Sequence, residues 1–451
     1  MMRLSQVQNA LGAVLAGEDG FFASVSSDTR TLLPGALFVA LRGKRHDGHD
    51  FLIQAREKGA AAALAHKACP GLPCLVVPDT ALALLRLAAL WRQEIKPISV
   101  IAVTGTNGKT TVKEMLGAIF SQSGRPIMSP GNRNNEVGAP LSLLTATPSH
   151  TQVVLELGIN AKGEMARLGD CVRPDLAMIT NAQKGHLEGF GDTRGVAEEK
   201  GVLLSFLQEG GTAVLNRDDP HFPLWQEMAR GKRILTFGSH REATVRGDLQ
   251  DGELVLRAQG EFSGLGEESF PFSLLGRHNL QNALAAAAAA LALGVEKEDI
   301  AKGLQGFGGV PGRLTLRVLP GGAQVLDDTY NANPGSLEAG LAVLKHLGEK
   351  RKILVLGDMG ELGSFSQRAH EEAGEMARAS GTEKLLALGK WTRYACKSFG
   401  EGAAHFENAQ DLAHALLSLA DGKTAVLVKG SRAMRMEEVV DALFGNAASC
   451  S

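Results

Sequence analysis

The run Gly105-Thr106-Asn107-Gly108-Lys109-Thr110-Thr111 has the composition of a phosphate-binding loop, and it joins an apolar run at 98–103 to a helix-like run at 112–120. Such a turn points backbone N–H groups at phosphate oxygens, while the Lys109 ammonium reaches the terminal phosphates and the Thr110 hydroxyl can hold Mg²⁺. The loop is shorter than the general P-loop pattern, with two residues between its glycines. Because a purely structural turn would not need Lys-Thr at its end, the sequence predicts a nucleoside triphosphate site.

Two further side chains follow apolar runs and are candidates for metal ligation. Glu156 ends a predicted strand that starts at Val153, and a carboxylate buried there needs a cation nearby. Since the carboxyl ends of parallel strands line one crevice, Glu156 is expected beside the phosphate loop. His186 lies in the loop 180–191 after another predicted strand. Taken alone, Glu156 is more consistent with a surface ion pair, and His186 with a hydrogen-bonded structural residue, than either is with a metal ligand.

Three other positions carry groups that suit phosphoryl transfer only in the right surroundings. Lys200 lies in Ala197-Glu198-Glu199-Lys200-Gly201, which by composition is a charged and solvated helical turn. Asn282 precedes an alanine-rich run, where an amide also serves as a helix cap. Arg313 lies at an inferred hinge, from which an arginine can swing onto a γ-phosphate as two domains close. Alone, none of the three identifies a function.

The runs between these motifs predict an α/β protein in which parallel sheets position the loops. Short β-rich runs alternate with helix-length runs, the pattern of parallel sheets with crossover helices. The length of 451 residues suits several domains. We expect an N-terminal domain at 1–82, a central P-loop domain at 83–313 with a small hairpin around Asp251-Gly252, and a C-terminal Rossmann-like domain at 314–451. The last domain should contain strands at 325–327, 353–356, 385–388 and 425–428.

Charge and composition exclude several classes of partner. The 47 Lys and Arg nearly balance the 49 Asp and Glu, so no electrostatic attraction to nucleic acid or an anionic membrane is expected. Five cysteines form no CxxC pair in this long chain, which favours a reducing compartment. The first twenty residues make a poor signal peptide, and the apolar run 283–293 is too short to span a bilayer. A cytoplasmic protein without membrane insertion is expected.

The compact Gly-Thr-Asn-Gly-Lys-Thr loop, taken with the other motifs over essentially the whole chain, resembles the Mur ligases and their folylpolyglutamate synthase relatives. The resemblance implies binding of ATP and two Mg²⁺ ions, with Thr110, Glu156, His186 and a carbamylated Lys200 as metal ligands. It also implies that Asn282 contacts the adenine, that Arg313 contacts the γ-phosphate, and that Asp328 positions the nucleotide from the third domain. The family usually has alanine where Gly185 stands.

Further motifs resemble the substrate-binding elements of the same family. The loop Ser27-Asp28-Thr29-Arg30 resembles its UDP-binding element, although by composition it is also an ordinary salt-bridged turn. Asn134, Asn135 and Glu136 resemble its contacts to the UDP-muramoyl group. Tyr330-Asn331-Ala332-Asn333-Pro334 resembles the version found in members that add D-alanyl-D-alanine, with Asn331 and Asn333 as amide partners of the dipeptide. Loop asparagines often only form turns.

The resemblance therefore implies an ATP-dependent amide ligase that acts as a monomer on UDP-N-acetylmuramoyl-tripeptide and D-alanyl-D-alanine through an acyl phosphate. The alternative enzyme is a folylpolyglutamate synthase-like or other Mur-type amino-acid ligase, which the Ser27–Arg30 and Tyr330–Pro334 motifs disfavour. A catalytically inactive nucleotide-binding scaffold is a third reading. The presence of Lys109, Thr110, Glu156, His186 and Lys200 argues against it.

Overall fold

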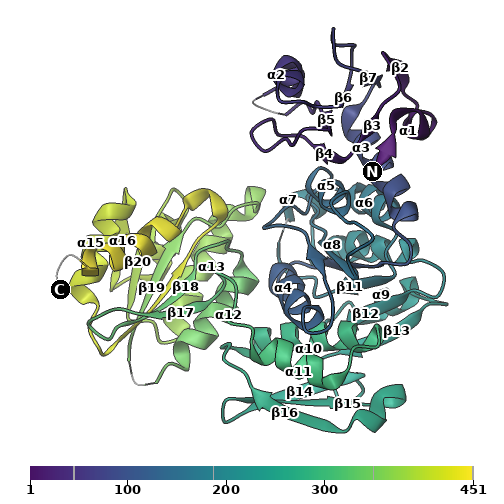
Figure 1. The fold of residues 1–451 in the computed structure, drawn as a ribbon. Helices are drawn as coiled ribbons and strands as arrows, with labels where there is room; N and C mark the ends of the chain where they lie inside the picture. Colours follow the sequence, from purple (N-terminus) through teal and green to yellow (C-terminus); the bar gives the residue numbers. More distant parts are fainter. Residues whose placement is uncertain (44–45, 186, 349, 449–451) are drawn as a thin grey trace.

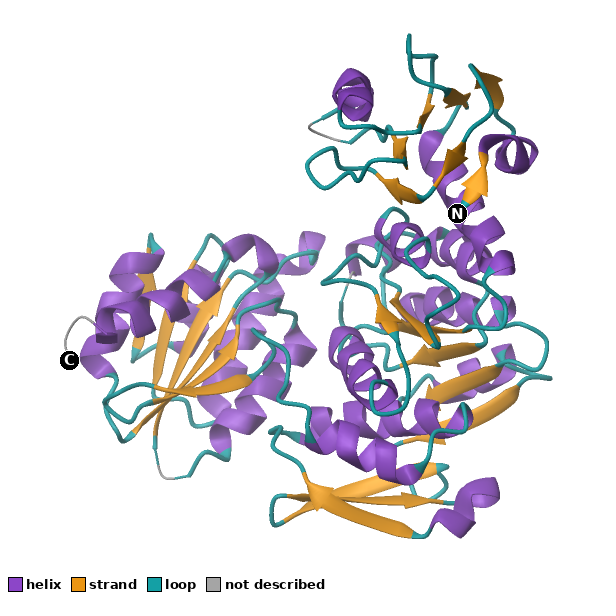
Figure 2. Cartoon of the chain, in the orientation of Figure 1, coloured by secondary structure: helices purple, strands orange, loops and turns teal. Residues whose placement is uncertain are grey.

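The computed structural model describes residues 1–43, 46–185, 187–348 and 350–448. These residues form three regions that follow one another along the chain, each built on a sheet of its own (Figure 1). Helices cover the faces of the sheets (Figure 2). The predicted α/β class is confirmed.

The N-terminal region is a small sheet connected to the next region by the helix α3 (Thr80–Glu94). Asp79 caps this helix by accepting the N–H groups of Ala81 and Leu82, and the helix packs against α5 and α6 of the central region. The expected boundary at residue 82 thus falls inside α3. The five-stranded sheet has the order β2-β7-β6-β5-β4, and β1 pairs with β3. The other elements are β1 (Met2–Arg3), α1 (Leu4–Leu11), β2 (Val14–Ala16), β3 (Phe21–Phe22), β4 (Ser24–Ser26), β5 (Ala36–Val39), η1 (Gly48–Phe51), α2 (Leu52–Glu57), β6 (Ala62–Ala65) and β7 (Cys74–Val76).

The central region has a nine-stranded sheet of order β16-β15-β14-β13-β12-β11-β8-β10-β9. Strands β8 to β13 are parallel, and β14, β15 and β16 add an antiparallel flap. The predicted hairpin is present: Gln250 pairs with Glu253, and Asp251 and Gly252 both have positive φ. The strands are β8 (Ser99–Thr104), β9 (Ile127–Met128), β10 (Gln152–Glu156), β11 (Leu176–Ile179), β12 (Thr212–Asn216), β13 (Arg233–Phe237), β14 (Val245–Gln250), β15 (Glu253–Ala258) and β16 (Glu267–Pro271).

Helices cover both faces of the central sheet and leave the carboxyl ends of its parallel strands open. Apolar residues of α4, α10 and α11 form one core, and those of α3, α5, α6, α8 and α9 form another. The helices and helical turns are α4 (Lys109–Phe120), α5 (Gly138–Leu143), α6 (Glu164–Val172), α7 (Leu187–Phe190), α8 (Thr193–Gly201), η2 (Val202–Phe206), α9 (Phe222–Met228), η3 (Gly260–Leu265), α10 (Arg277–Ala292) and α11 (Lys297–Gln305).

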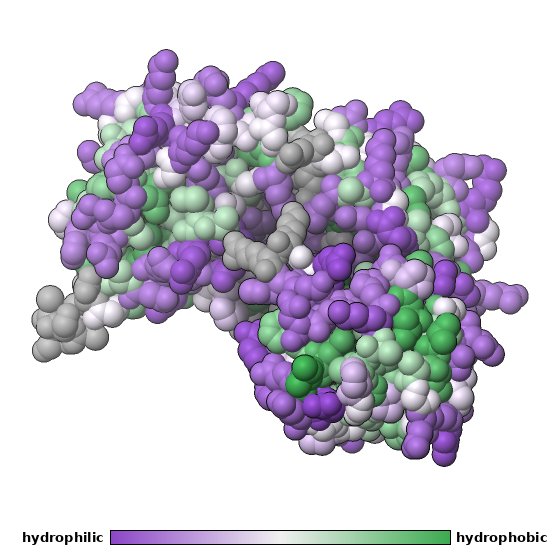
Figure 3. Space-filling model, turned by 90° about the horizontal axis from the view of Figure 1, so that it is seen from above, coloured by the Kyte–Doolittle hydropathy of each residue, from purple (hydrophilic) through white to green (hydrophobic). Residues whose placement is uncertain are grey.

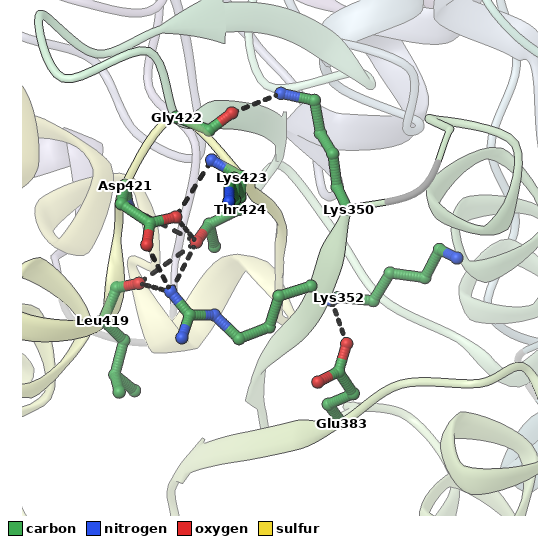
Figure 4. Close-up of polar contacts among 9 residues, drawn as sticks. Lys350, Lys352, Glu383, Leu419, Asp421, Gly422, Lys423 and Thr424 are labelled. Atoms are coloured by element: carbon green, nitrogen blue, oxygen red, sulfur yellow. Dashed lines mark hydrogen bonds and ion pairs between the residues drawn. The ribbon is translucent and has the colours of Figure 1, made fainter.

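The C-terminal region is a six-stranded sheet of order β17-β18-β22-β19-β20-β21. Four strands match the predicted ones, and the antiparallel β17 and the edge strand β21 were not predicted. Polar contacts tie the amino ends of β19 and β22 together, opposite the functional ends of the strands (Figure 4): Lys350 Nζ donates to the Gly422 carbonyl at 2.9 Å. The elements are β17 (Thr315–Val318), β18 (Gln324–Asp328), α12 (Pro334–Lys345), β19 (Arg351–Gly357), η4 (Gly363–Phe365), α13 (Ser366–Ala379), β20 (Lys384–Leu388), α14 (Thr392–Phe399), β21 (Ala403–Phe406), α15 (Ala409–Leu419), β22 (Thr424–Lys429), η5 (Arg432–Met434) and α16 (Glu437–Ala448).

One face of the molecule is largely polar (Figure 3). Hydrophilic residues cover most of the face seen in Figure 3, and hydrophobic ones gather in separate patches. Among the described residues, no helix combines the length and the apolar character needed to cross a membrane.

Candidate active site

A cleft of about 1430 Å³ lies between the central and C-terminal regions. The phosphate-loop candidate and the ends of β10, β11 and β12 line it from the central side, together with the start of α10. The loops after β18, β19 and β22 line it from the C-terminal side. The carboxyl ends of parallel strands from two sheets therefore face one shared space, as expected for ligand sites in α/β folds.

The phosphate-loop candidate connects β8 to α4 in a conformation that requires its glycines. Gly105 and Gly108 have φ of 149° and 85°. A Cβ on Gly105 would lie 1.8 Å from Thr180 Oγ1, and one on Gly108 would lie 2.3 Å from Asn282 Oδ1. Lys109 Nζ donates to the carbonyls of Gly105 and Thr106 at 2.8 and 3.1 Å, so the ammonium lies over the loop. The α4 N-terminus and this ammonium form a cradle for phosphate.

Glu156 lies at the end of β10 beside this loop, as the sequence predicts. It is 2% exposed, accepts the Thr110 hydroxyl at 2.8 Å and accepts the Asn134 amide at 2.7 Å. Arg313 approaches from the hinge, with Nη2 donating to Thr110 Oγ1 at 3.0 Å. Its guanidinium stacks on the Tyr330 ring at 3.9 Å, and its buried Nε has no hydrogen-bond partner among the described residues. The site thus brings together the oxygen atoms of Thr110 and Glu156, the Arg313 guanidinium, and an Arg313 Nε–H that has no partner among the described residues.

Lys200 lies at the end of α8 and is 1% exposed. Burial lowers the pKa of its amine well below the usual value, and the nearby Lys109 ammonium lowers this pKa further, while the Glu199 carboxylate opposes the shift. The Lys200 amine has no hydrogen-bond or ion-pair partner within the described ranges. The pKa of Lys109 is also lowered, chiefly by burial, while Glu156 and Glu361 oppose that shift. A charged solvated turn is therefore the wrong description of Lys200.

Two neighbours fix the helix that carries Lys200. The carboxylate of Glu199 accepts the N–H groups of Gly163 and Met165 at 2.8 and 3.1 Å, at the start of α6. The fully buried Trp225 donates its indole N–H to the Ala197 carbonyl at 3.0 Å. The Glu199 carboxylate is thus engaged by the start of α6, next to the buried Lys200.

His186 lies outside the described residues, so its predicted ligand role has no structural account. In the described part of the chain, no three His, Cys, Asp or Glu side chains converge as a metal site. Gly185, its neighbour, lies close to the phosphate loop, since a Cβ there would be 2.7 Å from Thr106 Cγ2.

Asn282 lies in the second turn of α10 rather than before the helix. The helix begins at Arg277 with Gly276 as its N-cap, so the capping alternative is excluded. The Asn282 amide accordingly sits against Gly108 of the phosphate loop and donates to Asn279 Oδ1 at 3.3 Å.

The C-terminal side of the cleft holds the remaining predicted residues. Asp328 pairs with the buried Lys429, which also donates to the Asn331 carbonyl at 2.9 Å. Asn333 caps α12 by accepting the Ser336 N–H at 2.9 Å, and its amide donates to Asn107 Oδ1 at 2.8 Å across the cleft. A direct amide contact therefore links the two regions at the phosphate loop.

The predicted UDP-binding loop does not line this cleft. Its Arg30 and Asp28 pair with each other at 2.7 Å, a contact that lowers the pKa of Asp28 to about 2. Thr29 donates to Gln54 at 2.6 Å, and Ser27 is half-buried.

The predicted muramoyl contacts lie in the central region. Asn135 accepts the N–H groups of Val137 and Gly138, and Glu136 pairs with Arg167.

Three polar residues at and just after the end of β12 were not predicted as site residues. Asp219 accepts the Ala182 N–H at 2.9 Å, Asp218 accepts the Gln281 amide at 2.7 Å, and both line the cleft. Asn216 donates to the Thr180 carbonyl at 2.8 Å. Asn216 ends a buried parallel strand, as Glu156 does, and Asp218 and Asp219 follow directly in the next loop, so the rule that identified Glu156 also applies to this strand end.

Three family models match successive parts of the chain. They are the Mur ligase family catalytic domain over residues 22–80, the Mur ligase middle domain over 103–290, and the Mur ligase glutamate ligase domain over 312–432.

Full-length relatives and solved structures agree with these matches. The chain is 40% identical over 449 residues to the UDP-N-acetylmuramoyl-tripeptide–D-alanyl-D-alanine ligase of Escherichia coli strain K12, covering 98% of each chain. It is 36% identical to the Bacillus subtilis strain 168 protein of that name, covering 93% of each. It superposes on MurF from Acinetobacter baumannii with a TM-score of 0.89 at 32% identity, covering 98% of each chain. For the Thermotoga maritima MurF ligase in complex with ADP the TM-score is 0.82 at 27% identity, covering 95% of this chain and 98% of that one.

Proposed function

The chain belongs to the Mur ligase family, and we propose that it is an ATP-dependent ligase joining D-alanyl-D-alanine to UDP-N-acetylmuramoyl-tripeptide. We further propose that the reaction takes place in the cytoplasm, as the last cytoplasmic step of peptide-stem assembly. The observation that carries the proposal is the contact of Arg313 and Glu156 with the same Thr110 hydroxyl, because it brings the hinge, the strand end and the phosphate loop to one point.

The reaction proceeds in two steps on the substrates. The tripeptide carboxylate attacks the γ-phosphorus of ATP, forming an acyl phosphate and releasing ADP. The dipeptide amine then attacks the acyl carbon, loses a proton, and the tetrahedral intermediate expels phosphate to leave the amide. Such phosphoryl transfer depends mainly on positioning and charge stabilisation. We assign that stabilisation to the loop N–H groups, Lys109 and Arg313.

The donor set around Thr110 fits magnesium. Mg²⁺ prefers hard oxygen ligands beside phosphate, and the Glu156 carboxylate and Thr110 hydroxyl are oxygen donors 2.8 Å apart at the phosphate loop. We assign these two residues, with His186 and Lys200, to two Mg²⁺ ions. When bound, the ions would neutralise charge that develops on the transferring phosphoryl group.

The state of Lys200 supports carbamylation. A neutral, buried amine can add to CO₂, forming an N–C bond and losing one proton, so that an anionic oxygen donor replaces a cation. The lowered pKa of the Lys200 amine favours its neutral form, which is the form that reacts with CO₂.

The remaining assignments follow the positions of the residues. Asn282, against Gly108, is assigned to the adenine and Asp328 to nucleotide positioning. The loop Ser27–Arg30 is assigned to UDP; Asn134, Asn135 and Glu136 to the muramoyl group; and Asn331 and Asn333 to the dipeptide. We further propose that the protein acts as a monomer, with the three regions as its three functional domains.

The decisive experiment measures phosphate release from ATP with all combinations of UDP-muramoyl peptides and amines. Release should require both UDP-N-acetylmuramoyl-tripeptide and D-alanyl-D-alanine, because the site is assembled around both. Single omission of either substrate is the matched control. Equal activity with a folate and glutamate would instead favour a folylpolyglutamate synthase-like enzyme.

A further inference from the structure

Lys113 is a buried cation that no part of the proposed reaction uses. It is 0% exposed, and its Nζ donates to the carbonyls of Ser129 and Gly131 at 2.7 and 3.1 Å. The Glu114 carboxylate lies 2.9 Å from the same nitrogen. An ammonium has three N–H groups, and three oxygens surround this one. Lys113 is thus held in one place by the chain segment that follows β9.

The position of Lys113 on α4 connects that segment to the nucleotide site. Residues three and four apart lie on the same face of a helix. Lys113 is therefore on the face of Thr110 and Lys109, one turn farther from the phosphate loop. One helix face accordingly presents two groups to the nucleotide and a third to the segment after β9.

The same segment contacts Glu156 at both its backbone and its side chain. The Glu156 N–H donates to Ser129 Oγ at 3.1 Å, and Asn134 donates to Glu156 Oε1 at 2.7 Å. The Ser129 N–H in turn donates to the Val154 carbonyl at 3.0 Å. Lys113, Ser129 and Glu156 therefore form a continuous polar chain that ends at the carboxylate beside the phosphate loop.

Stability alone does not account for a charge in this position. Burying an ion costs free energy that its partners only offset, and apolar residues of similar volume are often as stabilising. Partners behind a metal ligand, by contrast, fix its orientation. We propose that Lys113 is a positioning residue that holds the loop 129–136 and, through it, keeps Glu156 oriented to accept Mg²⁺ beside the nucleotide. This inference rests on the proposed function, which supplies the role of Glu156.

The test compares Lys113→Met with Arg92→Met. Arg92 is a matched control because it is also buried, at 2% exposed, and has the same kinds of partner. Its guanidinium donates to the carbonyls of Val172 and Arg173 and to the carboxylate of Asp175. It lies outside the cleft lining. The readout is the ratio of ADP dissociation constants measured by calorimetry with EDTA and with excess Mg²⁺. Lys113→Met should lower this ratio roughly 10- to 100-fold, whereas Arg92→Met should lower only the melting temperature.

A second variant covers the case in which Lys113→Met does not fold. Ser129→Ala keeps the carbonyl that accepts from Lys113 and removes only the hydroxyl that accepts the Glu156 N–H, so it should also lower the ratio. Wild-type ratios in folded Lys113→Met or Ser129→Ala would overturn the proposal. Because ADP and Mg²⁺ are the only ligands used, this result is independent of whether the protein ligates peptides.

Discussion

Two lysines of the central region are buried to the same degree but have opposite surroundings. Lys113 is 0% exposed and Lys200 is 1% exposed. The first lies among two carbonyls and a carboxylate. The second has a cation, Lys109, as a neighbour, and its adjacent carboxylate is engaged by α6. Burial therefore does not decide what a lysine does; the groups around its nitrogen do.

The difference separates a charge used to hold structure from an amine available for chemistry. Acceptors stabilise an ammonium, whereas burial without them favours the neutral amine. Lys113 thus suits orientation of a loop, and Lys200 suits reaction with CO₂. The predictions below test this distinction, beginning with the cation next to Lys200.

The largest effect is expected for Lys109→Ala. The ammonium is the cation that the loop itself provides for the terminal phosphates, so phosphate release should fall by at least about 10³-fold. The circular dichroism spectrum should be unchanged. Near-normal phosphate release in a folded variant would remove the phosphate-loop assignment.

Lys200→Ala should lower turnover by roughly 100-fold, because loss of the proposed anionic metal ligand would cost about 3 kcal/mol of transition-state stabilisation. Added acetate or formate should restore part of the rate by supplying carboxylate oxygen. Steady-state kinetics with and without these anions measures the effect.

Two controls belong to this experiment. Lys200→Arg should remain inactive, since a guanidinium keeps its charge and forms no carbamate. Lys113→Ala should gain nothing from acetate or formate, because its site is already lined by oxygen atoms. Full activity of both Lys200 variants would contradict the carbamate.

The pH dependence of stability should distinguish wild type from Lys200→Met in CO₂-free buffer without Mg²⁺. The folded-state pKa of Lys200 lies well below 10.5, so between these values the unfolded chain binds one more proton. Wild-type stability should therefore rise with pH in this window, by up to about 1.4 kcal/mol per pH unit relative to the variant. Denaturant unfolding at several pH values measures the slope, and parallel curves would show that Lys200 is charged when folded.

The smallest effect is expected for Glu199→Gln. The amide oxygen can still accept the N–H groups at the start of α6, so only the charge interaction with that helix is lost. The free energy of unfolding should fall by about 0.3–1 kcal/mol. Turnover should stay near the wild-type value, since the oxygen donor at Lys200 is not supplied by Glu199. If Glu199→Gln lost as much turnover as Lys200→Ala, the metal ligand would have been assigned to the wrong residue.

The sequence predicted the parts of the fold and site that follow general rules. Parallel strands appear as apolar runs, and a polar residue at such a strand end points into the ligand crevice. These rules sufficed for the phosphate loop and for the position of Glu156 beside it. The α/β class, with its second Rossmann-like unit, followed from the alternation of strands and helices.

The parts that were missed depend on tertiary contacts. The strands β16, β17 and β21 carry exposed or intermediate residues at most positions, so they lack an apolar signal. The sequence around Asn282 is also typical of a helix N-cap, and only the observed start of α10 at Arg277 excludes that role. Lys113 and Lys200 look like ordinary surface lysines, because their burial is caused by segments distant in the sequence.

Because Trp225 contacts α8, its fluorescence should report on changes at Lys200. The sequence contains three tryptophans, and the ring of Trp225 lies against Gly201 while its N–H is bonded to the helix that bears Lys200. Indole emission depends on nearby charge and on hydrogen bonding at this nitrogen. In a variant with Trp91 and Trp391 replaced by phenylalanine, the proposed uptake and release of CO₂ at Lys200 would be followed in real time by fluorescence, without any substrate present.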